Sequence, residues 1–179
     1  MNQKNFFLIS FLPALAYWYL ESHYDLKIAL IGGFLLGMLE IILEKVFTGH
    51  VHSLSKMNIF LIILLGIISY LFQDGVWFKL QPFFTGLIMG GLLLLNLHKH
   101  ESYLWDLMIQ SNNPNLAKEI VFMLEKHLAF FLMIYGCFMA ILAIYFSTNV
   151  WTFFKTAGLY IVFALFMVLE LVYIRKFKR

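Results

Sequence analysis

The stretch FLIILLGIISYLF, residues 60–72, decides the fold class of this chain. Its side chains are apolar at almost every position and do not alternate in polarity, whereas the strands of a membrane β-barrel alternate apolar and polar residues. A segment that crosses a bilayer must also satisfy its own backbone hydrogen bonds, which a helix does without help from other segments. The stretch therefore predicts a membrane-spanning α-helix.

The composition extends this prediction to the whole chain. Of the 179 residues, 62% are hydrophobic and 13% are charged, and the mean hydropathy is +0.83. A soluble domain is about half apolar and about a quarter charged, and one core of this length could not hide so much apolar surface. We therefore expect an integral membrane protein of the all-α class.

The apolar residues fall into six segments, several of them near the roughly 20 residues that a spanning helix needs. The segments are 6–20, 26–43, 57–72, 82–97, 120–146 and 156–174. They predict a polytopic helix bundle of about six segments that forms a single membrane domain over residues 1–179. The first segment is short and contains Pro13, so it is either a kinked span or a re-entrant piece. Its resemblance to a cleaved signal peptide is weak, and we expect it to be retained.

The longest connection, between the fourth and fifth segments, contains ESYLWDLMIQ at residues 101–110. Ser102, Asp106 and Gln110 recur every four residues among apolar side chains. This spacing predicts a short interfacial helix that lies along the membrane surface. The sequence SNNPN that follows favours a turn.

The basic residues are distributed unequally between the two sides of this arrangement. If six segments span, ten of the 13 Lys and Arg residues fall on one side, and the other side receives Lys27, Lys79 and Lys155. The positive-inside rule then places both termini in the cytoplasm. If the first segment does not span, the amino terminus lies outside while the RKFKR tail stays in the cytoplasm.

The lightly charged outer side carries two related turns, QDGVWFKLQPFFTG at 73–86 and STNVWTFFKTAG at 147–158. Interfacial anchoring in the aromatic belt explains Trp18, Trp77 and Trp151 without a functional role. Asp25 and Asp74 are candidate partners across these turns for Lys79 and Lys155. The Gly-x-x-x-Gly pairs 33/37 and 86/90 predict close helix packing within the bundle or at a dimer seam.

Three acidic residues in apolar segments are candidates for function, because a carboxylate in the bilayer is costly unless it is paired or hydrated. They are Glu40, Glu44 and Glu170. The structural alternative is pairing with Lys45 or Arg175 near the helix ends. The functional alternative is a small transporter or lipid-moving protein that uses these intramembrane carboxylates.

Histidines on the cytoplasmic side suggest a second alternative, a membrane metalloenzyme. The weak candidate ligands are His50, His52, His98, His100 and Glu101. The His-x-His spacing separates the two rings by about 200° on a helix, so we favour no metal site. The chain has no nucleotide-binding fingerprint and too few basic residues for nucleic-acid binding, and we expect no cofactor and no enzymatic activity.

Three motifs in order along the chain carry a resemblance to a known family. FLPALAYWYLESHYDLKIAL, LFQDGVWFKLQPFFTGLIMGGLLL and NVWTFFKTAGL resemble the bacterial septation protein A family, also called inner-membrane-spanning protein YciB. The resemblance covers nearly the whole chain and implies a multi-pass protein of the bacterial inner membrane. It marks these positions: Pro13, Asp25, Lys79, Trp151, Phe154, Lys155 and Gly158.

The resemblance implies a non-enzymatic role in cell-envelope integrity, septation or elongation. The expected partners are the lipid bilayer and envelope or division proteins, with a homo-oligomer as a further alternative. The candidate interaction residues are those that the resemblance marks, together with Trp77. We expect the Phe154-Lys155 step to carry the recognition surface, because interfacial anchoring does not explain it.

Overall fold

The computed structural model describes residues 12–49, 51, 53–110 and 117–177, and all regular structure in this part of the chain is helical. The elements in chain order are α2 (Leu12–His23), α3 (Leu26–Thr48), α4 (Ser53–Phe72), α5 (Val76–Lys79), α6 (Gln81–His98), α7 (Tyr103–Gln110), α8 (Lys118–Tyr145), α9 (Thr148–Phe153), the π-helix η1 (Phe154–Gly158) and α10 (Leu159–Phe177). The predicted all-α class is confirmed.

Five stretches of the described chain are long and apolar enough to cross a membrane. They are Leu26–Phe47, Ser55–Phe72, Val76–His98, Lys118–Tyr145 and Thr148–Arg175. They correspond to the last five predicted segments. The first predicted segment is represented by α2, whose 12 residues rise about 18 Å and fall short of the roughly 30 Å hydrocarbon core. Residues 6–11 of that segment lie outside the described residues.

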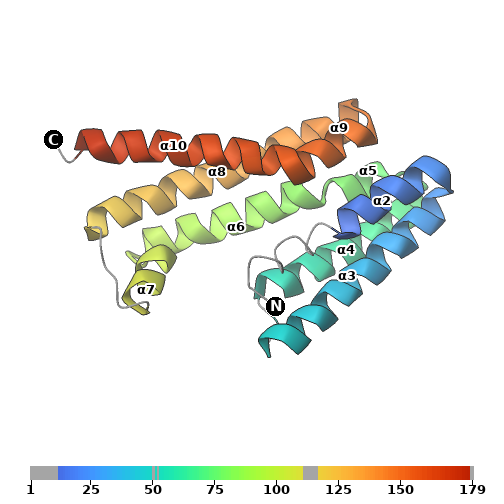
Figure 1. The fold of residues 1–179 in the computed structure, drawn as a ribbon, viewed down its shortest axis with the longest axis horizontal. Helices are drawn as coiled ribbons and strands as arrows, with labels where there is room; N and C mark the ends of the chain where they lie inside the picture. The colour runs from blue at the N-terminus through green and yellow to red at the C-terminus, as the bar shows by residue number, and fades with distance from the viewer. Residues whose placement is uncertain (1–11, 50, 52, 111–116, 178–179) are drawn as a thin grey trace.

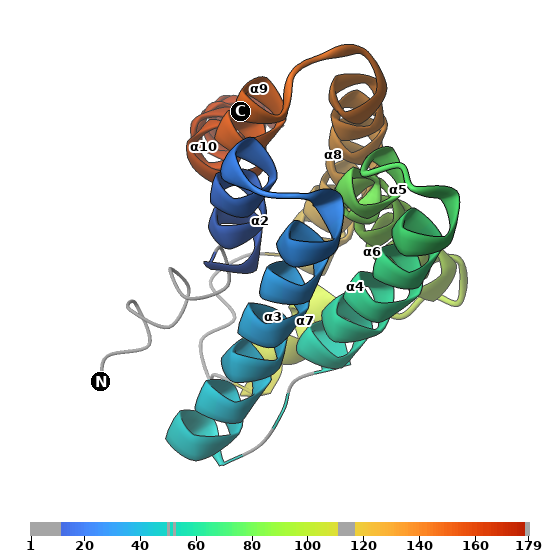
Figure 2. The same ribbon diagram turned by 90° about the vertical axis from the view of Figure 1, so that its right-hand side faces the viewer.

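The helices form two groups that meet at one end of the molecule (Figure 1). One group contains α2, α3 and α4, and the other contains α6, α8 and α10. The groups meet where α5 and α9 lie and diverge toward the opposite end, as the second view also shows (Figure 2). We call the first end the turn end, because it carries the short connections 24–25, 73–75 and 146–147, and we call the opposite end the loop end.

Small residues bring α6 and α8 into backbone contact. A Cβ atom added to Gly86 would lie 2.4 Å from the carbonyl oxygen of Leu132, and one added to Gly90 would lie 2.7 Å from that of Ala129. Gly136 of α8 lies opposite, with the Phe83 carbonyl oxygen 3.1 Å from its own added Cβ. The pair Gly86 and Gly90 therefore packs within the bundle, as one of the two sequence alternatives predicted.

A buried carboxylate from α8 fixes the start of α7. Glu125 is fully buried and accepts hydrogen bonds from the hydroxyl of Ser102 and from the backbone N–H groups of Tyr103 and Leu104, both at 3.1 Å. A carboxylate at this position satisfies N–H groups that have no partner inside the helix and complements the helix dipole. The short helix predicted at 101–110 forms at Tyr103–Gln110, and its position along the membrane surface stays a prediction.

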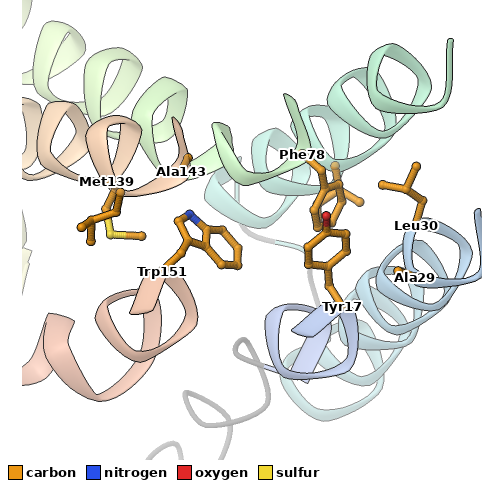
Figure 3. Packing of buried hydrophobic residues seen from close by; sticks show 9 residues of the cluster. Tyr17, Ala29, Leu30, Phe78, Met139, Ala143 and Trp151 are labelled. Carbon is orange, nitrogen blue, oxygen red and sulfur yellow. The ribbon is translucent and has the colours of Figure 1, made fainter. Parts of the chain in front are cut away.

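The main hydrophobic cluster lies at the turn end and joins both groups of helices (Figure 3). Tyr17 of α2, Phe78 of α5 and Trp151 of α9 are its largest side chains, and each is at most 1% exposed. Leu30 of α3 and Met139 of α8 complete its two sides. The three turns therefore carry the main hydrophobic cluster of the described residues.

Candidate functional site: the turn cluster

Eight side chains from five elements meet at the turn end, and we call them the turn cluster. They are Tyr17 and Glu21 of α2, Phe78 and Lys79 of α5, Gln81 of α6, Thr148 and Trp151 of α9, and Lys155 of η1. The sequence motifs that carry the family resemblance supply most of them. Residues up to 138 positions apart in the chain thus form one site.

Local hydrogen bonds turn the QDGVWFK sequence into the single helical turn α5. Ser69 donates to the carbonyl oxygen of Asp74 at 2.7 Å and accepts from the N–H of Phe78 at 2.9 Å. The carboxylate of Asp74 accepts from the N–H of Val76 at 2.9 Å. Gly75 is needed because an added Cβ would lie 2.5 Å from the hydroxyl oxygen of Tyr17. These contacts direct Phe78 and Lys79 toward the cluster.

Trp151 is the centre of the turn cluster and not an interfacial anchor. It is 0% exposed, and its Nε1 donates to the carbonyl oxygen of Lys79 at 2.9 Å. Its ring meets Tyr17 edge-on with centroids 6.3 Å apart, and Tyr17 stacks on Phe78 at 4.5 Å, an arrangement visible in Figure 3. The interpretation of Trp151 as a belt residue was wrong, because its indole N–H has a buried partner that the sequence pattern does not reveal.

Trp18 and Trp77 were also expected in the aromatic belt. Trp18 is 37% exposed and donates to the side chain of Asn149. Trp77 is half-buried, and its ring lies 5.9 Å from that of Phe72. Both positions at the turn end are compatible with anchoring at a membrane surface.

The ion pair of the cluster joins α2 to α5. Lys79 Nζ lies 2.9 Å from Glu21 Oε1, and the two side chains are 10% and 23% exposed. Lys79 also donates to the hydroxyl of Thr148. The predicted pairing of Lys79 with an aspartate was wrong. Asp25 is exposed at the start of α3, and the carboxylate of Asp74 accepts the backbone N–H of Val76 in α5.

Lys155 anchors a second set of polar contacts that crosses the bundle. Its Nζ donates to Gln81 Oε1 at 2.8 Å, and Gln81 Nε2 donates to the side chain of Asn58 in α4. The ammonium also lies 4.9 Å from the ring centroid of Trp151, within cation–π range. Lys155 therefore contacts groups of α6 and α9 directly, and Gln81 links it to Asn58 of α4. The expectation that Lys155 pairs with an aspartate was wrong.

The Phe154–Gly158 segment is a π-helix between α9 and α10. Such segments are rare and frequently occur at functional sites. The carbonyl oxygen of Phe154 accepts from the hydroxyl of Tyr135 at 2.6 Å, and its ring meets Phe138 edge-on at 5.1 Å. A Cβ added to Gly158 would lie 2.8 Å from the Phe154 ring, so this glycine makes room for a side chain of its own segment.

The three intramembrane acids are buried, with Glu40, Glu44 and Glu170 at 6%, 1% and 7% exposure. Glu170 pairs with His127 of α8, whose Nδ1 lies 2.8 Å from Glu170 Oε1. The alternative that Glu170 pairs with Arg175 was wrong, because the neighbouring helix α8 offers the imidazole of His127 at this depth. Glu40 and Glu44 lie one turn apart on α3.

The remaining candidates lie apart from the turn cluster. His98, His100 and Glu101 are exposed at the loop end, and His50 and His52 lie outside the described residues. Within the described ranges, no three His, Cys, Asp or Glu side chains are grouped closely enough to hold a metal ion. Pro13 is in the first turn of α2, but its side chain is outside the described part.

Sequence reasoning missed several members of the turn cluster and its neighbours: Tyr17, Glu21, Phe78, Gln81, Thr148 and Asn58. The amides of Asn58 and Gln81 were detectable, because each sits next to a long apolar run where an amide needs a partner. The other four resemble ordinary interfacial or core residues. Their partners become apparent only when the turns are assembled.

Comparison with known proteins agrees with the motifs. The profile of the family described as intracellular septation protein A matches residues 6–179. No match was found among curated proteins or among solved structures. Because the profile covers nearly the whole chain, including every residue of the turn cluster, this chain belongs to the intracellular septation protein A family.

Proposed function

We propose that this protein is a non-enzymatic component of the bacterial inner membrane that supports septation and envelope integrity through lateral contacts with proteins and lipids. The family assignment supports a septation-related role, and the five membrane-length stretches support a multi-pass membrane protein.

The non-enzymatic part of the proposal rests on one observation: the residues that the family resemblance marks form contacts with other residues of the protein. Lys79 pairs with Glu21, Trp151 donates to the backbone of Lys79, and Lys155 donates to Gln81. Each contact joins two elements of the turn end. A catalytic site uses its polar groups on a substrate, whereas these groups are used on one another. We infer that the turn cluster is a clasp that sets the positions of the long helices.

The surface for partners then lies on the outer faces of the helices that the clasp positions. In the Thr148–Arg175 stretch, 11% of the apolar window is buried inside the protein, compared with 22–28% in the other four stretches. This stretch therefore offers the largest share of its surface to the bilayer or to a neighbouring protein.

Site-specific photocrosslinking in living cells tests the proposal. Phe153 is 50% exposed and adjoins the cluster, while Trp151, two residues earlier, is 0% exposed. A photoreactive residue at position 153 or at Leu169 should capture an envelope or division protein, and the same residue at position 151 serves as the buried control. Capture of no such protein, in cells where the gene rescues a septation defect of a deletion strain, would contradict the proposal.

A small transporter is the second candidate, and the burial of Glu40 and Glu44 in α3 favours it. Its test is the rescue of the deletion strain by the variant Glu40→Gln, with normal amounts of protein in the membrane. Full rescue would remove this candidate, because glutamine cannot carry a proton or an exchangeable charge. Loss of rescue at normal protein levels would favour it over the first candidate.

A further inference from the structure

An apolar groove of about 560 Å³ runs between α8 and the segment formed by η1 and α10. Five phenylalanines and two aliphatic side chains form most of its wall, with Tyr135 in the middle and His127 at one end. Phe131 of α8 and Phe166 of α10, which both line it, stack with centroids 4.6 Å apart. The groove lies outside the turn cluster, and the clasp does not use it.

The depth of the groove places it in the hydrocarbon region. Its lining residues on α8 extend from His127 to Phe138, which is about 16 Å along the helix. The whole of α8 has 28 residues and is about 42 Å long, which exceeds a core of about 30 Å. Its exposed charged residues, Lys118, Glu119 and Lys126, all precede the groove, so the excess length lies at the loop end and the groove begins near the loop-end boundary of the core. Molecules that reach this depth are hydrocarbon chains and transmembrane helices.

The length and the charged end of the groove favour one of these two occupants. A single hydrocarbon chain is much narrower than a helix, and about 16 Å is close to the depth of one leaflet, half of the roughly 30 Å core. This length favours one acyl chain.

The polar and charged groups give the groove a direction. His127 and Glu170 form their 2.8 Å contact at the end of the groove nearer the loop end, and Glu170 Oε2 is buried without a hydrogen-bond partner among the described residues. Lys126 and Arg175 are exposed and lie nearer the same end of their helices. The two cations at this end suit the phosphate of a lipid whose chain lies in the groove.

We propose that this groove is a binding site for one acyl chain of a glycerophospholipid from the leaflet at the loop end, with the headgroup toward Lys126 and Arg175. The chain fills the aromatic wall from Phe166 to Phe154, and the His127–Glu170 pair marks its polar end. The inference is independent of the proposed role in septation, because it rests on the α8–α10 groove alone.

Photolabelling in defined vesicles tests this site. The purified protein is reconstituted in phosphatidylethanolamine and phosphatidylglycerol with a trace of phosphatidylethanolamine that carries a diazirine in the middle of one acyl chain. Ile134 lines the groove and is 68% exposed, while Leu165 of α10 is outside the groove and is 60% exposed. A bound chain should label Ile134 about tenfold more than Leu165, which corresponds to about 1.4 kcal/mol of preference.

A groove-filling variant provides the second measurement. Val162→Trp should lower the label at Ile134 to the level at Leu165, whereas the matched change Leu165→Trp should leave it unchanged. Equal labelling of Ile134 and Leu165 in the unaltered protein would overturn the proposal, and that comparison requires no variant. Efficient chain-to-chain crosslinking from a photoreactive residue at position 134 would also overturn it, because a second copy would then occupy the groove.

Discussion

The indole Nε1 of Trp151 donates a hydrogen bond of 2.9 Å to the carbonyl oxygen of Lys79. This contact joins two turns that share a Val-Trp sequence, since Lys79 follows Val76-Trp77 and Trp151 follows Val150. The two tryptophans have different environments, because Trp151 is fully buried and Trp77 is half-buried. The similar turns therefore have unlike roles, and the second one supplies the centre of the clasp.

The substitution Trp151→Phe should lower the free energy of unfolding by about 1–3 kcal/mol, because it leaves the buried Lys79 carbonyl without its donor. The measurement is denaturant unfolding of the purified protein in mixed micelles. Trp18→Phe is the matched control, since Trp18 is 37% exposed and water can replace its partner Asn149. Equal effects of the two substitutions would show that the Trp151 bond is not special.

The ion pair between Lys79 and Glu21 predicts that substitutions at these two positions have strongly non-additive effects on the free energy of unfolding. Removing one charge, as in Lys79→Met or Glu21→Gln, should cost about 3 kcal/mol because the other charge stays in a poorly solvated site. The double variant should be more stable than the sum of the single effects predicts. A double-mutant cycle measures this difference, and simple additivity would refute the coupling.

The contact between α6 and α8 predicts opposite outcomes for two glycines. Gly86→Ala should destabilise the protein by about 1–3 kcal/mol, because the new methyl group would lie 2.4 Å from a backbone oxygen of α8. Gly91→Ala should be neutral or slightly stabilising, since nothing lies within 4 Å of its added Cβ and alanine favours helix. Thermal unfolding in micelles compares the two, and a tolerated Gly86→Ala would contradict the close approach.

Glu125 predicts the stability of α7. The change Glu125→Ala should speed amide hydrogen exchange in residues 103–106 by about tenfold or more, since it removes the acceptor of two backbone donors. Glu119→Ala, an exposed site in the first turn of α8, should leave α7 unchanged. Hydrogen exchange followed by mass spectrometry measures the protection of α7 in both variants. Unaltered protection of α7 in Glu125→Ala would exclude the capping role.

The unequal distribution of basic residues predicts the orientation in the membrane. After replacement of Cys137, a cysteine introduced as Ser147→Cys should react with an impermeant maleimide in intact spheroplasts. Lys99→Cys should react only after the membrane is opened. The reverse pattern would place the loop end outside the cell and would contradict the positive-inside prediction.

Features of this protein that depend on interactions within one segment can be predicted from the sequence, whereas features that depend on contacts between distant segments require the structure. The apolar runs determined the fold class and five membrane-length stretches, because hydrophobicity and backbone satisfaction act within one segment. The pair Gly86 and Gly90 also predicted a packing face, because two glycines four residues apart lie on the same side of a helix and leave room for a neighbouring helix. The motifs also identified the family.

Tertiary structure alone decided what the marked residues do. Trp151 reads as an interfacial anchor in sequence, yet the meeting of α5 and α9 buries it. Lys79 pairs with Glu21 and not with Asp74, which is closer in the sequence. The reason is that α2 packs against α3 and α9 and brings the carboxylate of Glu21 to α5. Partner choice depends on which turns come together, and that information is spread over helices far apart in the chain. The groove between α8 and α10 has the same origin: its aromatic residues are ordinary membrane residues until two helices place them face to face.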